Sequence, residues 1–344
     1  MSVFSLFFNK KQQLLGIDIG SAQVKIVELV RKSQGLFLQA YAIEPMPTGL
    51  VIDRTITDAE AVGQVIVTAL NKTKFISTQA AAAVVGSVVM TKVIELDSKL
   101  NDIEREAQIR LEADKHIPYP LSEVNFDFDV IDQSPQNPND DKVLLAVSLT
   151  ENVDLRADAL IFAGLEAKVI DIECYAMQRA FSLAVNVGVD TFDDNRVMID
   201  IGHQQLTVYV FNDKEIIYNK EQAIDLNASD FSPSGDKVVV SKLTEEIRRA
   251  LLFYRSTQSS HLMIDGIKHL FLCGGINPLI MQDLQQALPK SLIDANIAFE
   301  NQIKVNITNP FNNMGVSPHI NPTQLAQDAP SLMLACGLAM RSFD

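Results

Sequence analysis

Two short segments of the chain share one pattern of hydrophobic and polar positions. The tetrapeptide Ile-Asp-Ile-Gly occurs at 17–20 and again at 199–202. Each copy precedes a segment rich in β-branched residues with partial alternation, at 23–30 and at 205–211. Alternation with a period of two is typical of strands, so each copy predicts a strand, a tight glycine turn and a second strand. The wide separation of the copies indicates two related domains that face one another rather than a solenoid.

Between the two copies, residues 88–165 predict a strand, a helix, two strands and a second helix, which is an α+β insertion in the first domain. Further along, residues 332–340 contain no charged side chain, which predicts a helix buried between layers. The first helix of the insertion is expected to end at the prolines of 118–120, because proline cannot donate a helical hydrogen bond. It carries one apolar stripe, formed by Leu100, Ile103, Ala107 and Leu111.

Length and composition limit the class of protein. At about 150 residues per domain, 344 residues suffice for two domains, and 47% apolar residues can fill their cores. A net charge of −14 argues against nucleic acid as the main partner, since phosphate contact needs a basic surface. The longest apolar stretch, 80–90, is too short for a membrane span. The three scattered cysteines and five histidines predict reduced core thiols in a cytoplasmic protein without a zinc site.

The repeated hairpins carry a specific chemistry. Gly20 and Gly202 have no Cβ, so the turns can bring backbone N–H groups close to an anion. Asp18 and Asp200 stand just before the turns, where a carboxylate can hold hydrated Mg²⁺ through its water shell. One such turn alone would be read as an ordinary hairpin, whereas two opposed copies predict a clamp for a polyphosphate. The other residues predicted to bind the phosphates are Ser21, Lys25 and Gln204.

A third glycine site follows the buried strand predicted over 267–273. Gly274 and Gly275 end this strand just before a predicted helix over 279–288. A strand, two glycines and a helix N-terminus allow the backbone to approach a nucleoside or phosphate closely. A Gly-Gly turn is common for structural reasons alone, so this pair indicates nucleotide binding only because it follows the two hairpins. In this order the three sites resemble the nucleotide-binding plan of the actin, Hsp70 and sugar-kinase superfamily.

Several uncommon elements narrow the resemblance. Residues 14–20 (Leu-Leu-Gly-Ile-Asp-Ile-Gly), 116–124 (His-Ile-Pro-Tyr-Pro-Leu-Ser-Glu-Val) and 309–314 (Asn-Pro-Phe-Asn-Asn-Met) resemble segments of the type IV pilus assembly protein PilM family. The C-terminal 328–344 is similar to that family's C-terminus almost residue for residue. The resemblance spans nearly the whole chain, except for about 223–240 and 289–305.

The resemblance implies an α/β, actin-like (ribonuclease H-like), FtsA-related two-domain fold with a 1C-type insertion and a shortened subdomain 2B. The implied subdomains are 1A over 1–87 and 166–195, 1C over 88–165, 2A over 196–222 and 263–344, and a reduced 2B over 223–262. The last helix is expected to pack back on subdomain 1A.

The resemblance also implies ATP or ADP with Mg²⁺ as cofactors and at most a weak ATPase activity. Glu173, at the end of a strand and the start of a helix, occupies the place of the residue that positions the attacking water. The open alternative is that Glu173 or the neighbouring Asp171 only caps that helix. No Ser-His-Asp set or paired-carboxylate constellation competes with this interpretation.

The implied partner is the N-terminal cytoplasmic peptide of PilN, bound in a groove between subdomains 1A and 1C. Other proteins of the pilus platform and the motor ATPases are further candidates, in a system that drives twitching motility. This places the protein in the cytoplasm, at the inner membrane through its partner. The residues predicted at the peptide groove can equally be read as a rigid connection between a helix and a strand; they are Ile117, Pro118, Tyr119, Pro120 and Leu121.

Three features differ from the family pattern. The second hairpin has His203-Gln204-Gln205 where small and hydroxyl residues are usual, and Ile276 follows the glycine pair in place of Thr. A short polar connection over 223–235 replaces the helical hairpin of 2B, which normally helps to cover adenine and ribose. The alternatives are therefore a metabolite kinase, which would use Asp171 and Glu173, and an adaptor without nucleotide. An FtsA-like membrane tether is disfavoured because no basic amphipathic helix ends the chain, and filament formation stays open.

Overall fold

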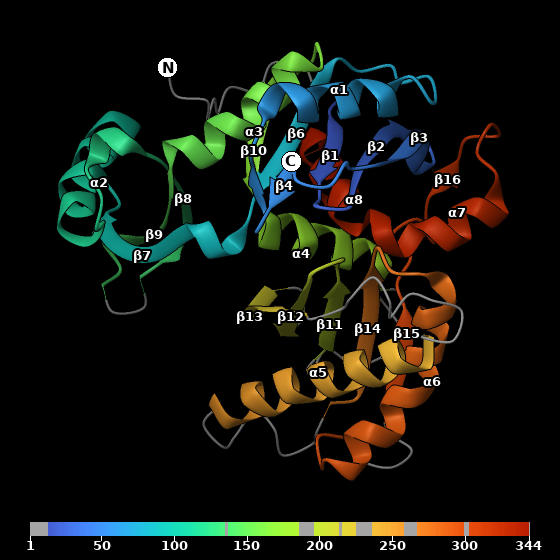
Figure 1. Cartoon of the computed structure of the whole chain (residues 1–344). Coiled ribbons are helices and arrows are strands. Elements are labelled where there is room, and N and C mark those ends of the chain that lie inside the picture. The colour runs from blue at the N-terminus through green and yellow to red at the C-terminus, as the bar shows by residue number, and fades with distance from the viewer. Residues whose placement is uncertain are drawn as a thin grey trace.

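The computed structural model describes residues 13–134, 137–185, 196–212, 215–224, 236–257, 267–298 and 303–343. Its two main sheets lie one above the other in Figure 1, with helices on both sides of each sheet. A third, smaller sheet stands out to one side (Figure 1). Within these described ranges, no helix is long and apolar enough to cross a membrane.

The first sheet has six strands in the order β10-β6-β1-β2-β3-β16. Strands β1 and β2 form the first predicted hairpin and pair antiparallel, while β6 runs parallel to β1 on the other side. The strands are β1 (Leu15–Ile19), β2 (Gln23–Lys32), β3 (Gly35–Pro45), β6 (Gln79–Val84), β10 (Glu166–Ile172) and β16 (Gly315–Val316).

Helices cover both faces of this sheet. One face packs against α1 (Ala59–Leu70) and α3 (Thr150–Phe162), with Ile17 and Ile26 of the sheet in the same core as Ile66 and Leu160 of the helices. The opposite face packs against α8 (Met333–Ala339), which contacts β1, β2 and α4 (Glu173–Ala184). Nearly every α8 side chain is buried, which explains why none is charged.

The second sheet has five strands in the order β13-β12-β11-β14-β15. Alternation along β11 gives both faces a core: Val197 and Ile199 point to α5 and α6, while Met198 points to α4. Strand β11 pairs antiparallel with β12, which confirms the second predicted hairpin. The strands are β11 (Arg196–Ile201), β12 (Gln205–Asn212), β13 (Glu215–Ala223), β14 (His269–Gly274) and β15 (Lys304–Ile307).

The outer face of the second sheet is covered by α5 (Asp236–Thr257) and α6 (Pro278–Asp294). The apolar face of helix α5 lies in the core of the second sheet. Helix α6 begins where Asn277 accepts a hydrogen bond from the Leu279 amide. The connection predicted to replace part of 2B lies largely outside the described residues, and the subdomain boundaries stay predictions.

The third sheet, with the order β7-β9-β8, packs beside α2 (Asp102–His116). The order of elements along 88–165 matches the predicted strand, helix, two strands and helix. Of the predicted apolar stripe, Leu100 packs against the core of the small sheet, but Ile103 is 82% and Leu111 66% exposed, whereas Ile109, outside the stripe, is fully buried. The strands are β7 (Val89–Asp97), β8 (Val124–Gln133) and β9 (Asp140–Leu149).

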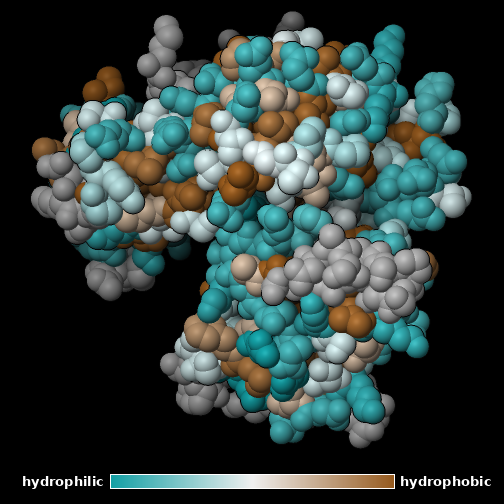
Figure 2. Space-filling view, viewed as in Figure 1, coloured by the Kyte–Doolittle hydropathy of each residue, from teal (hydrophilic) through white to brown (hydrophobic). Residues whose placement is uncertain are grey.

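The chain crosses between the two large sheets twice. It leaves the first sheet after α4 and returns after β15, through β16, α7 (Pro322–Asp328) and α8. As a result α4 and α8 lie between the two sheets (Figure 1). On the face seen in Figure 2, hydrophilic side chains gather where the upper and lower halves meet.

Candidate nucleotide-binding cleft

A cavity of about 610 Å³ lies between the two predicted hairpins. Residues of both turns line it, among them Gly20, Ser21, Gly202 and Gln204. A volume of this order is typical of small-molecule sites, which span about 300–1,000 Å³. The structure therefore brings together residues that the sequence separates by half of the chain.

The first hairpin places Asp18 directly across from Lys25. The Lys25 ammonium donates to the Asp18 carboxylate at 2.8 Å, and both side chains are largely buried. Burial acts to lower the pKa of Lys25, but the nearby carboxylates of Asp18 and Asp200 outweigh it and raise the pKa. Lys25 is therefore a fixed positive charge at the floor of the cleft.

The second hairpin repeats this geometry with a neutral partner. Asp200 stands across from Thr207, which is buried and also lines the cavity. Burial raises the pKa of the Asp200 carboxyl, with Lys25 opposing the shift. The Cys273 thiol on β14 lies 3.7 Å from Asp200 Oδ1. Lys25 thus faces two carboxylates, one from each hairpin.

The glycine amides close the turns rather than facing the cavity. Gly20 N–H donates to the Gln23 carbonyl at 3.0 Å, and Gly202 N–H donates to the Gln205 carbonyl at 2.8 Å. The same hydrogen bond in both copies shows that the hairpins match in geometry as well as in sequence. The backbone groups that can meet an anion therefore belong to the residues after each glycine, which include Ser21 and Gln204.

The glycine pair after β14 completes one wall. Gly274 has a φ of +117°, and a Cβ there would lie 2.1 Å from the Ile201 carbonyl oxygen. Gly275 donates its N–H to that same oxygen at 3.1 Å. Gly275 also faces Lys25, whose Nζ would be 3.9 Å from an added Cβ. The pair thus allows the wall to approach the first hairpin closely.

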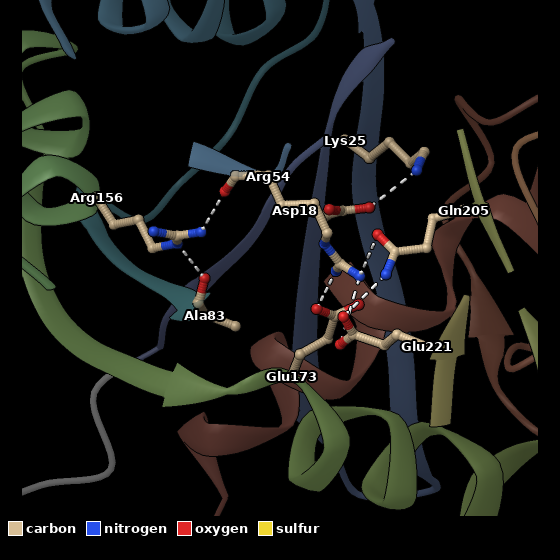
Figure 3. A network of polar contacts seen from close by, with 8 residues as sticks. All are labelled: Asp18, Lys25, Arg54, Ala83, Arg156, Glu173, Gln205 and Glu221. Atoms are coloured by element: carbon tan, nitrogen blue, oxygen red, sulfur yellow. Dashed lines mark hydrogen bonds and ion pairs between the residues drawn. The ribbon is translucent and has the colours of Figure 1, made fainter. Parts of the chain in front are cut away.

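Glu173 is the first residue of α4 and is almost fully buried. Burial raises the pKa of its carboxyl, opposed by its ion pair with Arg54. Figure 3 shows Arg54 pointing from another part of the chain into the space between Glu173, Gln205 and Glu221. At the N-terminus of α4, Glu173 lies in the first turn and Asp171 accepts a hydrogen bond from the Ile172 amide at 2.8 Å, so the helix-capping alternative stays open.

Asp171, the other acid considered for catalysis, points elsewhere. It is ion-paired with Arg179 and lies 3.6 Å from Arg341 Nε. It is not among the residues that line the cavity, whereas Glu173 is. The metabolite-kinase alternative therefore keeps only Glu173 at the cleft.

Sequence reasoning missed two arginines that shape the cleft. Arg54 stands in the tight turn between β4 (Val51–Ile52) and β5 (Thr55–Ile56). Arg156 on α3 is buried and donates to the carbonyls of Ala83 at 2.6 Å and Arg54 at 3.0 Å. Pairs of β-branched residues on either side of Asp53-Arg54 are a signal for a hairpin, but nothing in the sequence tells where its tip points.

The residues of the cleft fit a hydrated magnesium–nucleotide group. Asp18 and Asp200 supply carboxylate oxygens, which Mg²⁺ prefers, and Lys25 supplies a positive charge for phosphate. Among the described residues no three His, Cys, Asp or Glu side chains converge to hold a metal ion. Such a site suits Mg²⁺ held through its water shell, since Mg²⁺ usually keeps several waters.

The predicted peptide-binding segment connects α2 to β8. Ile117 is buried in the core of the small sheet, and Leu121 packs against the same core. The exposed members are Pro118, Tyr119 and Pro120, and Tyr119 is 50% exposed. These three offer exposed side chains, while Leu121 is partly buried.

The arrangement of two matched Asp-x-Gly hairpins across one cleft belongs to the actin-like ATPase fold. A solved structure described as the PilM–PilN type IV pilus biogenesis complex matches with a TM-score of 0.73 and 22% identity, covering 97% of this chain and 99% of that one. The ethanolamine utilization protein EutJ from Carboxydothermus hydrogenoformans matches with a TM-score of 0.50 and 12% identity, covering 95% and 89%.

The family model for the type IV pilus assembly protein PilM matches residues 16–225 and 238–343. The chain therefore belongs to the PilM family, as its motifs predicted, and is an actin-like protein of type IV pilus assembly. The unmatched residues between the two segments fall within the stretch where the sequence departs from the family pattern.

Proposed function

We propose that this protein is a cytoplasmic scaffold of the inner-membrane pilus platform that binds Mg-ATP in its cleft and a short peptide of PilN at its surface. The observation that carries the nucleotide half is the matched pair of hairpins around one cavity, with Asp18, Lys25 and Asp200 at its floor. The family supports the peptide half, and a solved relative is described as a complex of PilM with PilN.

In the proposed complex each hairpin contacts the phosphates from its own side. Lys25 acts as a point charge toward phosphate oxygens. Asp18 and Asp200 hold the waters of Mg²⁺, which neutralises phosphate charge when bound. Gly274 and Gly275 give the nucleoside a wall without side chains. Ser21 and Gln204 supply polar groups at the turns.

Glu173 is the proposed residue for orienting water at the terminal phosphate. Its burial raises the pKa of the carboxyl, which moves it toward the range useful for proton transfer near neutral pH. Its pairing with Arg54 keeps the carboxylate occupied in this structure. We propose at most a weak ATPase activity, with nucleotide acting chiefly as a ligand.

The decisive experiment is calorimetry of Mg-ATP binding to the intact protein. Asp18→Asn and Asp200→Asn keep the side-chain shape and remove the charge that would hold the metal, so binding should be lost or weakened in both. Asp283→Asn, on α6 away from the cleft, is the matched control. No heat at millimolar nucleotide, from protein with intact circular dichroism, would contradict the nucleotide half and leave the adaptor function.

The peptide half is tested separately with a labelled peptide from the cytoplasmic N-terminus of the PilN partner. An ordered peptide must offset its lost conformational freedom, so apolar anchors are expected to dominate its binding. Tyr119→Ala should weaken binding measurably, while Ile76→Ala, which removes another exposed large hydrophobic side chain elsewhere, should not. Equal affinity for Tyr119→Ala and wild type would move the peptide site away from this segment.

A further inference from the structure

One side chain crosses the cleft. Arg54 stands in the β4–β5 turn of the first domain and is ion-paired with Glu173 of that domain. Its guanidinium also donates to Gln205 at 3.3 Å and lies 3.6 Å from Glu221, both on strands of the second domain. Gln205 and Glu221 are themselves joined at 2.9 Å. Figure 3 shows these groups converging on one guanidinium. Arg54 therefore ties the two halves together.

The backbone at this point is unusual for the residues that it carries. Asp53 has a φ of 47° and Arg54 a φ of 64°, so both are left-handed. Two-residue hairpin turns of this kind favour Asn or Asp followed by Gly, because a Cβ is disfavoured at positive φ. The turn thus carries a long charged side chain at a position where glycine would cause less backbone strain. Strain of this kind persists where surrounding contacts compensate for it.

The base of the turn is fixed while the guanidinium is accessible. Arg156 holds the Arg54 carbonyl from below at 3.0 Å, and Arg156 is itself buried. The Arg54 side chain is 28% exposed, compared with 7% for Glu173. A ligand entering the cleft can therefore reach the guanidinium, whose attachment point stays in place.

On the proposed function, the contacts of Arg54 put it beside the expected place of the terminal phosphate. Its main partner is Glu173, the residue proposed to orient water at that phosphate. Lys25, the other cation of the proposed phosphate site, is already held by Asp18. Guanidinium binds phosphate through a planar fork of donors, with geometry that an ammonium cannot match. A phosphate in the cleft thus offers Arg54 a new partner.

We propose that Arg54 is an exchangeable clasp that senses the terminal phosphate of the nucleotide. Without nucleotide its guanidinium joins Glu173 to Gln205 and Glu221 across the cleft. With a nucleoside triphosphate bound, it turns to the terminal phosphate and releases the Glu173 carboxylate. This inference rests on the proposed function, since it requires that the cleft binds nucleotide.

The test compares a non-hydrolysable ATP analogue with ADP, both with Mg²⁺, by calorimetry. Arg54→Gly is the informative variant, because glycine accepts the left-handed φ, so the whole side chain is removed without adding backbone strain. It should weaken binding of the ATP analogue by about tenfold or more, the effect of one charge-assisted contact, and binding of ADP by less than about threefold. Arg54→Lys, which keeps the charge without the fork, should fall between. Arg249→Ala on the exposed face of α5 is the charge control.

A second measurement tests the contacts of Arg54 across the cleft in the absence of nucleotide. Hydrogen exchange in β5 and in the β12–β13 pair should be faster in Arg54→Gly and in Glu221→Gln than in wild type, and unchanged in Arg249→Ala. If exchange in Arg54→Gly equals that of wild type, the clasp is refuted.

The outcomes separate this inference from the proposed function. Wild type that binds neither nucleotide overturns both. Wild type that binds both nucleotides, with Arg54→Gly weakening them equally or not at all, overturns the sensing role and leaves the nucleotide site in place.

Discussion

The α-carbon of Gly337 in α8 faces the carbonyl oxygen of Ala176 in α4 with no room for a side chain between them. A Cβ on Gly337 would lie 1.8 Å from that oxygen. The β1 strand meets α8 in the same way, since a Cβ on Gly16 would lie 1.9 Å from the Ala335 oxygen. The central layer is therefore packed backbone against backbone on both sides of α8.

Gly337→Ala is expected to lower the free energy of unfolding by about 3 kcal/mol, because the added methyl must push two helices apart. Urea denaturation followed by circular dichroism measures this. Gly86→Ala is the control: its Cβ would meet only a flexible Glu221 oxygen at 3.6 Å. A Gly337→Ala protein as stable as wild type would show that α8 can shift without cost.

The packing of α2 on the small sheet gives a prediction for Ile109 and Ile103. It is opposite to the one from the apolar stripe, which includes Ile103 but not Ile109. Ile109→Ala should cost about 3 kcal/mol, because it opens a cavity in the core beneath α2. Ile103→Ala should change stability by less than about 0.5 kcal/mol, since that side chain is exposed. Both are read from chemical denaturation curves. Equal costs for the two variants would contradict the orientation of α2 described above.

Arg156 is expected to be essential for the shape of the cleft. Arg156→Met leaves the carbonyls of Ala83 and Arg54 without their donor and should cost about 3 kcal/mol. Arg249→Met, on the exposed face of α5, should cost less than about 0.5 kcal/mol. Thermal unfolding of the two variants side by side checks the difference. A mild effect of Arg156→Met would mean that water replaces the guanidinium.

Glu28 gives a prediction for pH. Its carboxyl is buried on β2 and accepts hydrogen bonds from the amides of Ile76 and Ser77. Burial raises the pKa of Glu28 above 4.5, and these amides oppose the shift. The folded state therefore keeps the proton over a range where the unfolded chain has released it. Stability contributed by Glu28 then falls as pH rises from the unfolded pKa through the folded one.

In Glu28→Gln this titration is absent. The unfolding free energy of wild type minus that of Glu28→Gln should therefore fall as the pH rises above about 4. It should level off above the pKa that Glu28 has in the folded state. Urea denaturation at intervals from pH 4 to pH 7 measures it. Glu60→Gln, at the exposed start of α1, controls for the change of net charge. A difference that is flat across this range would be inconsistent with a raised pKa.

How far the sequence predicts this molecule depends on the kind of contact involved. The hairpins around Asp18 and Asp200 were predicted because strand alternation and a glycine turn are local signals. Arg54 was missed because its role depends on where a two-residue turn points after the whole domain has folded. The exposure of Ile103 was missed for a related reason: periodicity identifies a stripe on α2 but not the side of the helix that meets the sheet.

The return of the chain to its first sheet has a consequence for synthesis. Strands β1, β2 and β3 leave the ribosome early, yet Val27, Leu29 and Leu38 are covered by residues 325–339, which are translated after the entire second domain. An apolar face of the first sheet must therefore wait, exposed or held by a chaperone, until residues 325–339 emerge. The first domain to be made is the last to be completed.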